Sequence, residues 1–382
     1  MFKKATIIFL AIMSNFSFLY AAIITVDNKY PSVGQYKTLQ EAYAAANDGD
    51  SIYVYPSKQA YGGLNISKRI TISGSIRVET STVGTLSLTV GSAGSIIDSL
   101  RIGGIYIYSK DNTIKNNAKT GDIKIYSENQ IIKQNNCGDI SIYANNQLVR
   151  NNVCGSVYID ADNVIIKQNN TSKITIDEGH RNNEVLQNKI SSYNNYDYLL
   201  HINKLNTITV KNNLIYNSSY SGGALKIDIA CNASLLSNIF RCHSWKRDYG
   251  DEYEYEGSAI TLSPETHAFF VNNIIYFGKV SSLGEYNYNL FYYTNYYSNN
   301  NNNIKGDPNF KNGYHLNDNS PAIGAGQNGT DMGIYGGDTP YVDNWAGSSS
   351  ILPIITQIKA EPIVAEGTQG LEISIKANAG SE

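Results

Sequence analysis

The 382-residue sequence lacks several features that would point directly to a function. It carries 30 Lys and Arg against 33 Asp and Glu, so the basic excess expected of a nucleic-acid-binding protein is absent. It contains no GxSxG, HExxH or Walker-type motif and no Cys or His spacing typical of zinc sites. Beyond the N-terminus, no apolar run is long enough to span a bilayer. We therefore expect no nucleic-acid partner and no cofactor, and the catalytic residues stay unassigned.

The first 21 residues are typical of a secretory signal peptide. Lys3 and Lys4 form a short basic region, an apolar stretch at 6–18 follows, and small residues end at Ala22. We expect a mature protein that begins near Ala22 and is secreted or held at the cell surface or in the periplasm. Export would permit disulfides, and four cysteines allow three full pairings. The cysteines are Cys137, Cys154, Cys231 and Cys242.

A short internal repeat dominates the sequence between residues 104 and 177. Each copy alternates apolar and polar residues, and its leading apolar residue recurs after 18, 17, 17 and 17 positions. The leading residues are Ile105, Ile123, Ile140, Val157 and Ile174. A fixed short period with alternating β-branched residues predicts one solenoid turn per repeat, with each strand in register with the next turn. The alternation places Ile105 and Ile107 inside the coil and Tyr106 and Tyr108 outside.

A second motif lies between these copies and recurs with the same step. It joins an apolar residue, a basic residue and an amide, as in Ile114-Lys115-Asn116. We expect the amides to point inward at a corner, where they bond each other and free backbone groups. The predicted amide ladder is Asn116, Gln134, Asn151, Gln168, Asn188, Asn212, Asn238 and Asn272.

Two adjacent apolar columns precede the predicted ladder, although simple alternation would bury only one. They are Ile131, Leu148, Ile165 and Val185, and next to them Ile132, Val149, Ile166 and Leu186. Either a bend in the strand buries both columns, or the first column forms an apolar strip outside the coil.

The two ends of the repeat region carry a family resemblance. Residues 38–46 are predicted to form an amphipathic helix with Thr38 near its N-cap, followed by a turn and strand at 47–56. This succession resembles the opening of right-handed parallel β-helix proteins such as pectinesterases and polysaccharide lyases, in which the helix plugs the coil. Residues 307–336, with Asp307-Pro308-Asn309-Phe310, look like the closing segment of bacterial β-helix surface proteins.

This resemblance implies an all-β, right-handed parallel β-helix of the pectin-lyase-like kind over residues 22–346, with a short N-terminal capping helix. The architecture hosts lyases, hydrolases, esterases, epimerases and non-enzymatic adhesins, so it does not fix an activity. The chain lacks the Gly-Asp-x-Asp-Phe motif of pectinesterase-like catalysis, and we do not expect that activity.

The C-terminal part is expected to be separate from the coil. Residues 347–352 are predicted to be a linker, because Gly347 and three serines follow one another. Two apolar stretches within 353–382 predict a β-hairpin similar to the first strands of a PKD or Ig-like domain. A lone hairpin is marginal in water, so either the chain is truncated or the hairpin packs on the helix end.

Three groups of residues are candidates for ligand binding. The first is an outward basic column of Lys115, Lys133, Arg150 and Lys167, each immediately before a predicted ladder amide. Stacked like charges favour a bound polyanion, and the alternative is a solvated stripe. The second is the long insertion 241–256, in which we select Trp245, Lys246 and Arg247 for substrate binding because long loops on rigid scaffolds often carry sites. The alternative is a solvated polar loop.

The third group is an outer column in which Tyr108, Tyr126 and Tyr143 are followed by Asp160 and Asp177. The tyrosines are expected to stack and stiffen the solenoid, or else to offer a sugar platform. Carboxylates about 4.8 Å apart repel unless a cation such as Ca²⁺ lies between them.

These features lead to three hypotheses. The first is an exported, monomeric and non-catalytic β-helix that binds polysaccharide or cell-surface glycans. The second is a polysaccharide lyase or glycoside hydrolase with its site in the insertion. The third is a structural envelope or adhesin repeat protein that needs no ligand.

Overall fold

The computed structural model describes residues 21–343, except 77–79, 194–196, 220–221, 244, 247–252, 255–256 and 299, together with the strands at 354–360 and 373–378. The signal peptide, apart from residue 21, and the linker predicted from the sequence lie outside these residues. Among the described residues, no helix has the length and apolarity needed to cross a bilayer.

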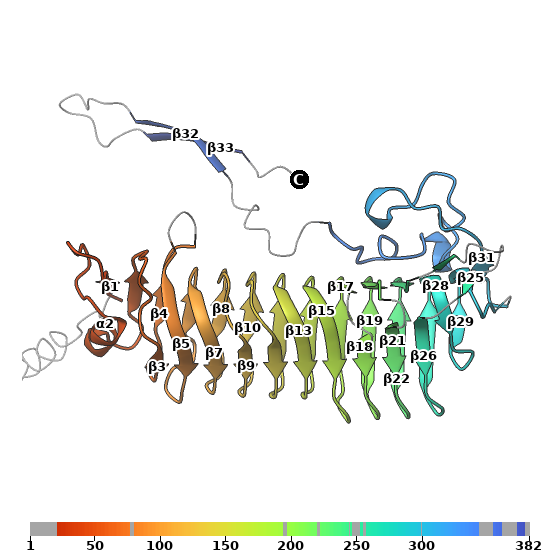
Figure 1. The fold of residues 1–382 in the computed structure, drawn as a ribbon, viewed down its shortest axis with the longest axis horizontal. Coiled ribbons are helices and arrows are strands. Elements are labelled where there is room, and N and C mark those ends of the chain that lie inside the picture. Colours follow the sequence, from red (N-terminus) through yellow and green to blue (C-terminus); the bar gives the residue numbers. More distant parts are fainter. Residues whose placement is uncertain are drawn as a thin grey trace, which may run out of the picture.

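The described chain winds into an elongated coil whose strands stack side by side along one axis (Figure 1). Sheet A has 13 parallel strands: β1 (Ile23–Val26), β2 (Ser51–Val54), β4 (Thr71–Ser73), β6 (Ile96–Asp98), β8 (Thr113–Lys115), β10 (Ile131–Lys133), β12 (Gln147–Arg150), β14 (Val164–Lys167), β16 (Asn183–Leu186), β19 (Thr207–Lys211), β22 (Asn232–Leu236), β27 (His267–Val271) and β29 (Glu285–Asn287).

Sheet B faces sheet A across the core and consists of parallel strands from the same coils. Its strands are β3 (Leu64–Ile66), β5 (Thr82–Leu88), β7 (Arg101–Ile107), β9 (Ile123–Ile125), β11 (Ile140–Ile142), β13 (Val153–Ile159), β15 (Asn170–Ile176), β17 (Lys189–Ser192), β18 (Tyr198–Ile202), β20 (Leu214–Asn217), β21 (Gly223–Ile227), β23 (Ile239–Arg241), β26 (Ser258–Leu262), β28 (Ile274–Val280), β30 (Leu290–Thr294) and β31 (Ile304–Lys305).

The predicted repeat sets the register of sheet B. Ile123 pairs with Ile105 and Ile140, and all three side chains are fully buried. Val157 and Ile174 continue the same inner column. The fold is therefore the predicted right-handed parallel β-helix, with one inward apolar column contributed by every coil.

A short helix closes the N-terminal end of the coil, as the sequence predicts. Helix α2 (Leu39–Ala45) begins at Thr38, whose hydroxyl accepts from the Glu41 backbone N–H at 3.2 Å. The Glu41 carboxylate in turn accepts from the Thr38 N–H at 3.2 Å, which completes a capping box. Leu39 and Ala42 are fully buried, so the apolar side of the helix covers the open end of the core (Figure 1).

The inner amide ladder exists, but its members lie one position later than predicted in most coils. The buried, stacked residues are Asn117, Asn135, Asn152, Asn169, Asn188, Asn213, Asn238, Asn273, Asn289 and Asn303. Of the predicted members only Asn188 and Asn238 belong to it. The residues before the ladder instead have positive φ, for example 56° at Asn151 and 55° at Gln168. A left-handed turn residue consumes one position at the corner, which shifts the inward side chain by one.

The strand register also places one of the two predicted apolar columns inside the coil and the other outside. Ile132, Val149 and Ile166 are fully buried, and Val185 continues this inner column in place of the predicted Leu186. The other column lies outside, where Ile131 is 37% exposed. The second of the two sequence alternatives, an apolar outer strip, is therefore correct.

Sheet B divides into two branches at β15. Asn170 and Thr171 pair with β17, whereas residues 174–176 pair with β18. The two branches meet again at β28, which pairs with both β23 and β26. Each of these turns therefore carries an additional strand and connection, which is why the repeats lengthen after residue 177.

The segment after β31 turns back along the outside of the coil (Figure 1). It buries Met332 and Ile334 against Ile239 and Ile274 in a small second core. Arg241 also holds this segment, because its Nη1 donates to the Tyr314 hydroxyl at 2.8 Å. Two short 3₁₀ turns occur in it, at Asn312–Tyr314 and Gln327–Gly329.

The four cysteines are free thiols in this structure. Cys137 and Cys154 lie on adjacent coils, as expected from their spacing of one repeat. The predicted C-terminal hairpin is present as β32 (Ile354–Ala360) paired antiparallel with β33 (Ile373–Asn378). Its assignment to a PKD or Ig-like domain stays a prediction.

Candidate functional site

The predicted basic column is a continuous feature of the outer surface of sheet A. Lys115 pairs in register with Lys133, Lys133 with Arg150, and Arg150 with Lys167. Four cations therefore stand on four successive strands, about 4.8 Å apart along the coil. We call these four residues the basic column.

The basic column has few counter-charges of its own. Lys115 pairs with Asp98 at 3.3 Å, at the N-terminal end of the column. Within the described residues, no ion pair is formed by Lys133, Arg150 or Lys167, and the Arg150 Nε is buried without a hydrogen-bond acceptor. Three of the four cations thus have no counter-charge among the described residues.

The column changes character after Lys167. Its next position is Leu186, and the position after that is Lys211. Lys211 forms an ion pair with Asp338 of the returning C-terminal segment. The uninterrupted run of half-buried cations therefore lies on β8, β10, β12 and β14.

The outer tyrosine column on sheet B forms a ladder. The ring centroids of Tyr126 lie 5.0 Å from Tyr108 and 5.1 Å from Tyr143, with interplanar angles of 6° and 8°. Because each ring covers the face of the next, mainly edges and hydroxyls are left for solvent. This arrangement fits the predicted stiffening role better than a platform for stacking sugars.

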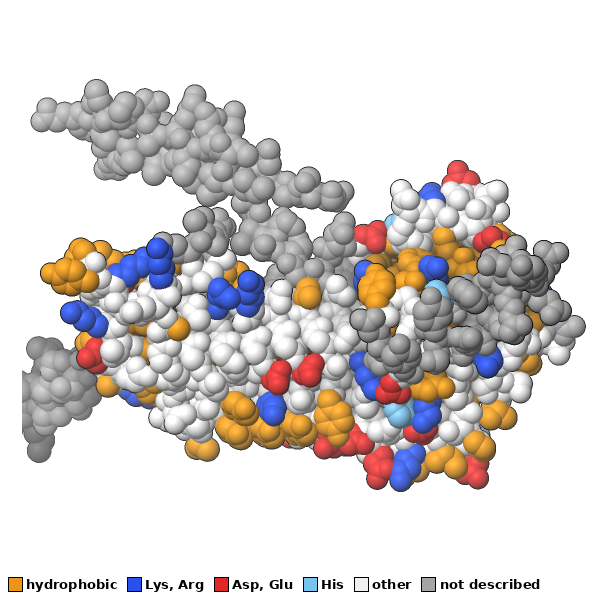
Figure 2. Space-filling model, viewed as in Figure 1, with side chains coloured by type: hydrophobic (Ala, Val, Ile, Leu, Met, Phe, Trp, Pro, Cys, Tyr) orange, Lys and Arg blue, Asp and Glu red, His pale blue; other side chains and the backbone are white. Residues whose placement is uncertain are grey.

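A polar cluster continues the tyrosine ladder. In Figure 2 an orange strip along the lower edge, below β7 to β13, runs into red, blue and pale blue side chains below β15 to β26. Asp160 contacts His180 Nε2 at 3.0 Å, and Asp162 contacts Nδ1 of the same ring at 3.2 Å. Because carboxylates only accept, the two contacts are hydrogen bonds at the same time only when both ring nitrogens carry a proton.

The next carboxylates of this column also have side-chain partners. The Tyr158 hydroxyl donates to Asp177 and holds the pKa of that carboxyl below its usual value, while the same bond raises the Tyr158 pKa. Two coils further on, Asp228 accepts from His201 at 2.9 Å and from Lys226 at 3.1 Å.

Protein groups therefore serve as counter-charges and donors in this column. Burial would raise the pKa of Asp228, but these hydrogen bonds outweigh burial and lower that pKa. Within the described residues, Asp160 contacts His180 and Asp177 accepts from Tyr158. A Ca²⁺ ion between these carboxylates stays a prediction. Among the described residues, no three His, Cys, Asp or Glu side chains are placed to hold a metal ion.

The described part of the long insertion consists of its first residues and two short paired strands. Cys242 is buried at its start, and β24 (Trp245–Lys246) pairs antiparallel with β25 (Tyr253–Glu254). Arg247 lies outside the described residues. The insertion leaves sheet B between β23 and β26, whereas the basic column lies on sheet A between β8 and β14, so the structure does not bring the two predicted groups together.

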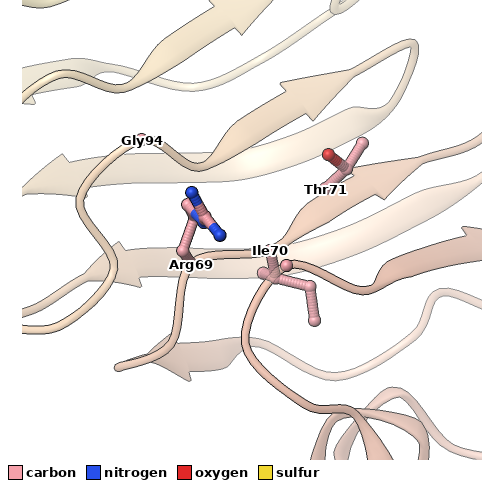
Figure 3. A pocket seen from close by; sticks show the side chains of 5 residues that line it. Arg69, Ile70, Thr71 and Gly94 are labelled. Atoms are coloured by element: carbon pink, nitrogen blue, oxygen red, sulfur yellow. The ribbon is translucent and has the colours of Figure 1, made fainter. Parts of the chain in front are cut away.

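A shallow hollow of about 200 Å³ lies near the N-terminal end, between Gly49, Arg69 and Gly94 (Figure 3). Its charged lining residue, Arg69, contacts Asp48 at 3.6 Å, and both side chains are largely exposed. We assign this hollow no function.

Sequence reasoning missed the histidines of the polar cluster. His201 and Lys226 occupy the position of Tyr158 in later copies of the repeat, as their pairing with Thr175 and with each other shows. The same alternation is present in the sequence at 199–203 and 224–228. The signal was therefore available, but the longer spacing of these copies concealed it.

No protein-family model matches the chain, and no curated protein matches it in sequence. Solved structures do resemble it. A PL6 family alginate lyase, AlyGC, is 12% identical with a TM-score of 0.45 over 86% of this chain, which spans 58% of that protein. Pectate lyase Pel9A is 13% identical with a TM-score of 0.36, over 83% of this chain and 97% of the other.

A PL6 family polysaccharide lyase from Pseudopedobacter saltans is 12% identical, with a TM-score of 0.35, over 81% of this chain and 96% of the other. These likenesses concern the course of the backbone. The chain covers little more than half the length of the alginate lyase.

Proposed function

We propose that this protein is exported and binds an acidic polysaccharide or cell-surface glycan along sheet A without cleaving it. The observation that carries the proposal is the register of Lys115, Lys133, Arg150 and Lys167 on four successive strands. Two unit charges 4.8 Å apart repel by about 0.9 kcal/mol in water, and more near a protein surface. A polyanion laid along the coil removes this repulsion at each step.

The C-terminal segment supports the proposal, because it places a carboxylate on the next cation of the same column. Asp338 pairs with Lys211, and the hydrogen bond from the Lys211 ammonium holds the pKa of the Asp338 carboxyl below its usual value. A carboxylate approaching from outside the coil is therefore compatible with the geometry of the column.

The test is binding of polygalacturonate by affinity electrophoresis at low and rising salt, with a neutral glucan as the non-binding control. We expect binding of the acidic polymer alone, weakening as salt rises. The variant Lys133→Glu/Arg150→Glu should bind at least about tenfold more weakly, a loss of roughly 1.4 kcal/mol.

The matched control is Lys110→Glu/Lys124→Glu, which changes the net charge equally away from sheet A. It should bind as the parent does. If both variants weaken binding equally, the effect comes from net charge and not from the basic column. If the parent binds no acidic glycan at low salt, the basic column is only a solvated stripe.

A second candidate function is polysaccharide cleavage, as a lyase or hydrolase, at the insertion. The observation in its favour is the β24–β25 pair, which gives this loop a defined base beside the split in sheet B. Trp245→Ala with Lys246→Ala should then abolish release of new chain ends from the polymer with little change in melting temperature. Loss of stability without loss of release would make the loop a packing element, and a parent that releases no ends would exclude cleavage. A parent that neither binds nor cleaves glycans would favour the structural repeat protein.

A further inference from the structure

Two cysteines are in register on successive coils. Asn136 forms a parallel bridge with Val153, and the Cys137 backbone N–H donates to the Val153 oxygen at 3.0 Å. Cys137 and Cys154 are therefore the next pair in this register, one strand spacing of about 4.8 Å apart. This separation lies inside the Cα range of about 4.4 to 6.8 Å that a disulfide spans. We call these two residues the cysteine pair.

Both side chains of the cysteine pair point into the coil. Cys154 is 8% exposed and belongs to the main core, and the half-buried Cys137 packs against the same core. The pair continues an inner column of small side chains, in which Thr120 pairs with Cys137 and Cys154 with Thr171. Members of an in-register column point the same way, so the two sulfurs are neighbours.

The two thiols also affect each other. A hydrogen bond with the Cys154 thiol raises the pKa of Cys137 well above its ordinary value, and burial raises it further. The carboxylates of Asp122 and Asp139 act in the same direction. These effects keep Cys137 protonated at neutral pH, which makes its oxidation slow.

The threonine next to the cysteine pair shows which way Cys137 is turned. Thr120 Oγ1 is buried and has no hydrogen-bond partner among the described residues. The Thr171 hydroxyl at the other end of the pair donates to the Gly155 oxygen at 2.5 Å. Cys137 therefore leaves its hydroxyl neighbour unbonded and interacts with Cys154 instead.

The other two cysteines lie apart from each other. Cys231 precedes β22 of sheet A, and its thiol donates to the Asn203 backbone oxygen at 2.9 Å. Cys242 follows β23 of sheet B and is buried. These two residues occupy different places around the coil, so the register brings only the cysteine pair together.

We infer that Cys137 and Cys154 are a disulfide-forming pair that closes one coil onto the next when the protein meets a disulfide oxidant. This modification site is independent of the proposed function. The two coils that it joins carry Lys133 and Arg150, so the bond fixes the spacing of the two middle cations of the basic column.

The reaction is thiol–disulfide exchange with a low-molecular-weight disulfide such as oxidised glutathione. The thiolate of the half-buried Cys137 attacks one oxidant sulfur, which forms a mixed disulfide and releases one glutathione. The Cys154 thiolate then attacks the Cys137 sulfur, forms the bond between the coils and releases the second glutathione. Two protein thiols thus give two electrons and two protons to the oxidant, which becomes two glutathione thiols.

The experiment maps the bond by mass spectrometry. The folded chain is treated with oxidised glutathione at about pH 8.5, where an ordinary thiol is half ionised. The remaining thiols are blocked with iodoacetamide in denaturant, and the chain is digested with trypsin, which cuts after Lys133, Arg150 and Lys167. The cysteine pair then falls on two peptides, 134–150 and 151–167. We expect these peptides to be joined, and to separate on reduction.

The bond should also stabilise the coil, because it restricts the unfolded chain across one repeat. After removal of glutathione, we expect the oxidised parent to melt about 3 °C or more above the reduced parent. Cys154→Ser should show neither joined peptides nor this rise, and Cys137→Ser gives the same test if Cys154→Ser does not fold. Cys231→Ser is the matched control, because a serine hydroxyl can keep the bond to Asn203, and it should behave as the parent.

Three results would overturn the inference. They are an oxidised parent without joined peptides, a folded chain in which Cys231 or Cys242 is joined instead, and a stable glutathione adduct on Cys137, which would put Cys154 out of reach. Joined peptides without a rise in melting temperature would overturn the closing of one coil onto the next. None of these measurements uses a glycan, so their failure leaves the proposed function intact.

Discussion

Replacing Asn152 with Leu tests the inner asparagine ladder most directly, because the substitution keeps the approximate shape and removes every polar contact. The Asn152 amide donates to the backbone oxygens of Ile132 at 2.9 Å and Arg150 at 3.0 Å. Its side-chain oxygen accepts from the Asn135 backbone N–H at 2.9 Å and from the Asn135 side chain at 3.0 Å. All of these ladder atoms are withdrawn from water, since Asn135 and Asn152 are fully buried.

The magnitude follows from the groups that lose their partners. Leu at this position leaves at least the buried Asn135 backbone N–H without an acceptor. An unpaired buried group of this kind costs about 1 to 3 kcal/mol, so we expect a loss of at least this size. This loss is a large share of the total stability of a domain, which is about 5 to 15 kcal/mol.

The assay is urea unfolding followed by far-UV circular dichroism, with Asn151→Gly as the matched control. Asn151 adjoins Asn152 in sequence but has a φ of 56° and faces outward, so glycine there should change the free energy of unfolding by less than about 1 kcal/mol. A larger loss in Asn151→Gly than in Asn152→Leu would refute the assignment of the ladder and restore the register expected from the sequence.

Three further predictions concern the core, a glycine contact and acid stability. Ile140→Asp places an unpaired carboxyl at a fully buried position and should cost several kcal/mol, seen as loss of cooperative unfolding. Gly223→Ala should cost about 1 to 3 kcal/mol in urea unfolding, because an added Cβ would lie 2.1 Å from the Tyr198 ring. The pKa of Asp177 is lowered in the folded state by the Tyr158 hydroxyl, so its contribution to stability is present above about pH 4 and is lost as the pH falls through the folded pKa. Asp177→Asn should therefore reduce the loss of melting temperature between pH 5 and pH 3, and an unchanged acid profile would count against this pair.

The sequence predicts the coil well because its inner apolar residues recur with a fixed step. The pairing of Ile123 with Ile105 and Ile140 follows from the 17- to 18-residue period alone. The corner is harder, because Asn-Asn and Gln-Asn pairs offer two candidates for one inward position. Only the backbone conformation decides between them, and positive φ at Asn151 assigns the inward position to Asn152.

The candidate site is predicted in part for related reasons. The cations of sheet A recur with a fixed period, so the sequence predicts their alignment on one surface. The split of sheet B at β15 has no comparable signal, because it depends on which part of one long strand pairs with which later strand. His180 reaches Asp160 and Asp162 only across neighbouring turns, and this contact depends on that packing.

The returning C-terminal segment has a consequence for how the coil comes apart. In a solenoid each turn contacts only its neighbours, so the end turns would open first and independently. Here Gln187 bonds Thr339 and Arg241 bonds Tyr314, so one returning segment is tied to several turns, the farthest contact joining residues 152 positions apart. The last turns should therefore unfold as one block rather than fray one by one, and amide hydrogen exchange should show the same protection in all of them.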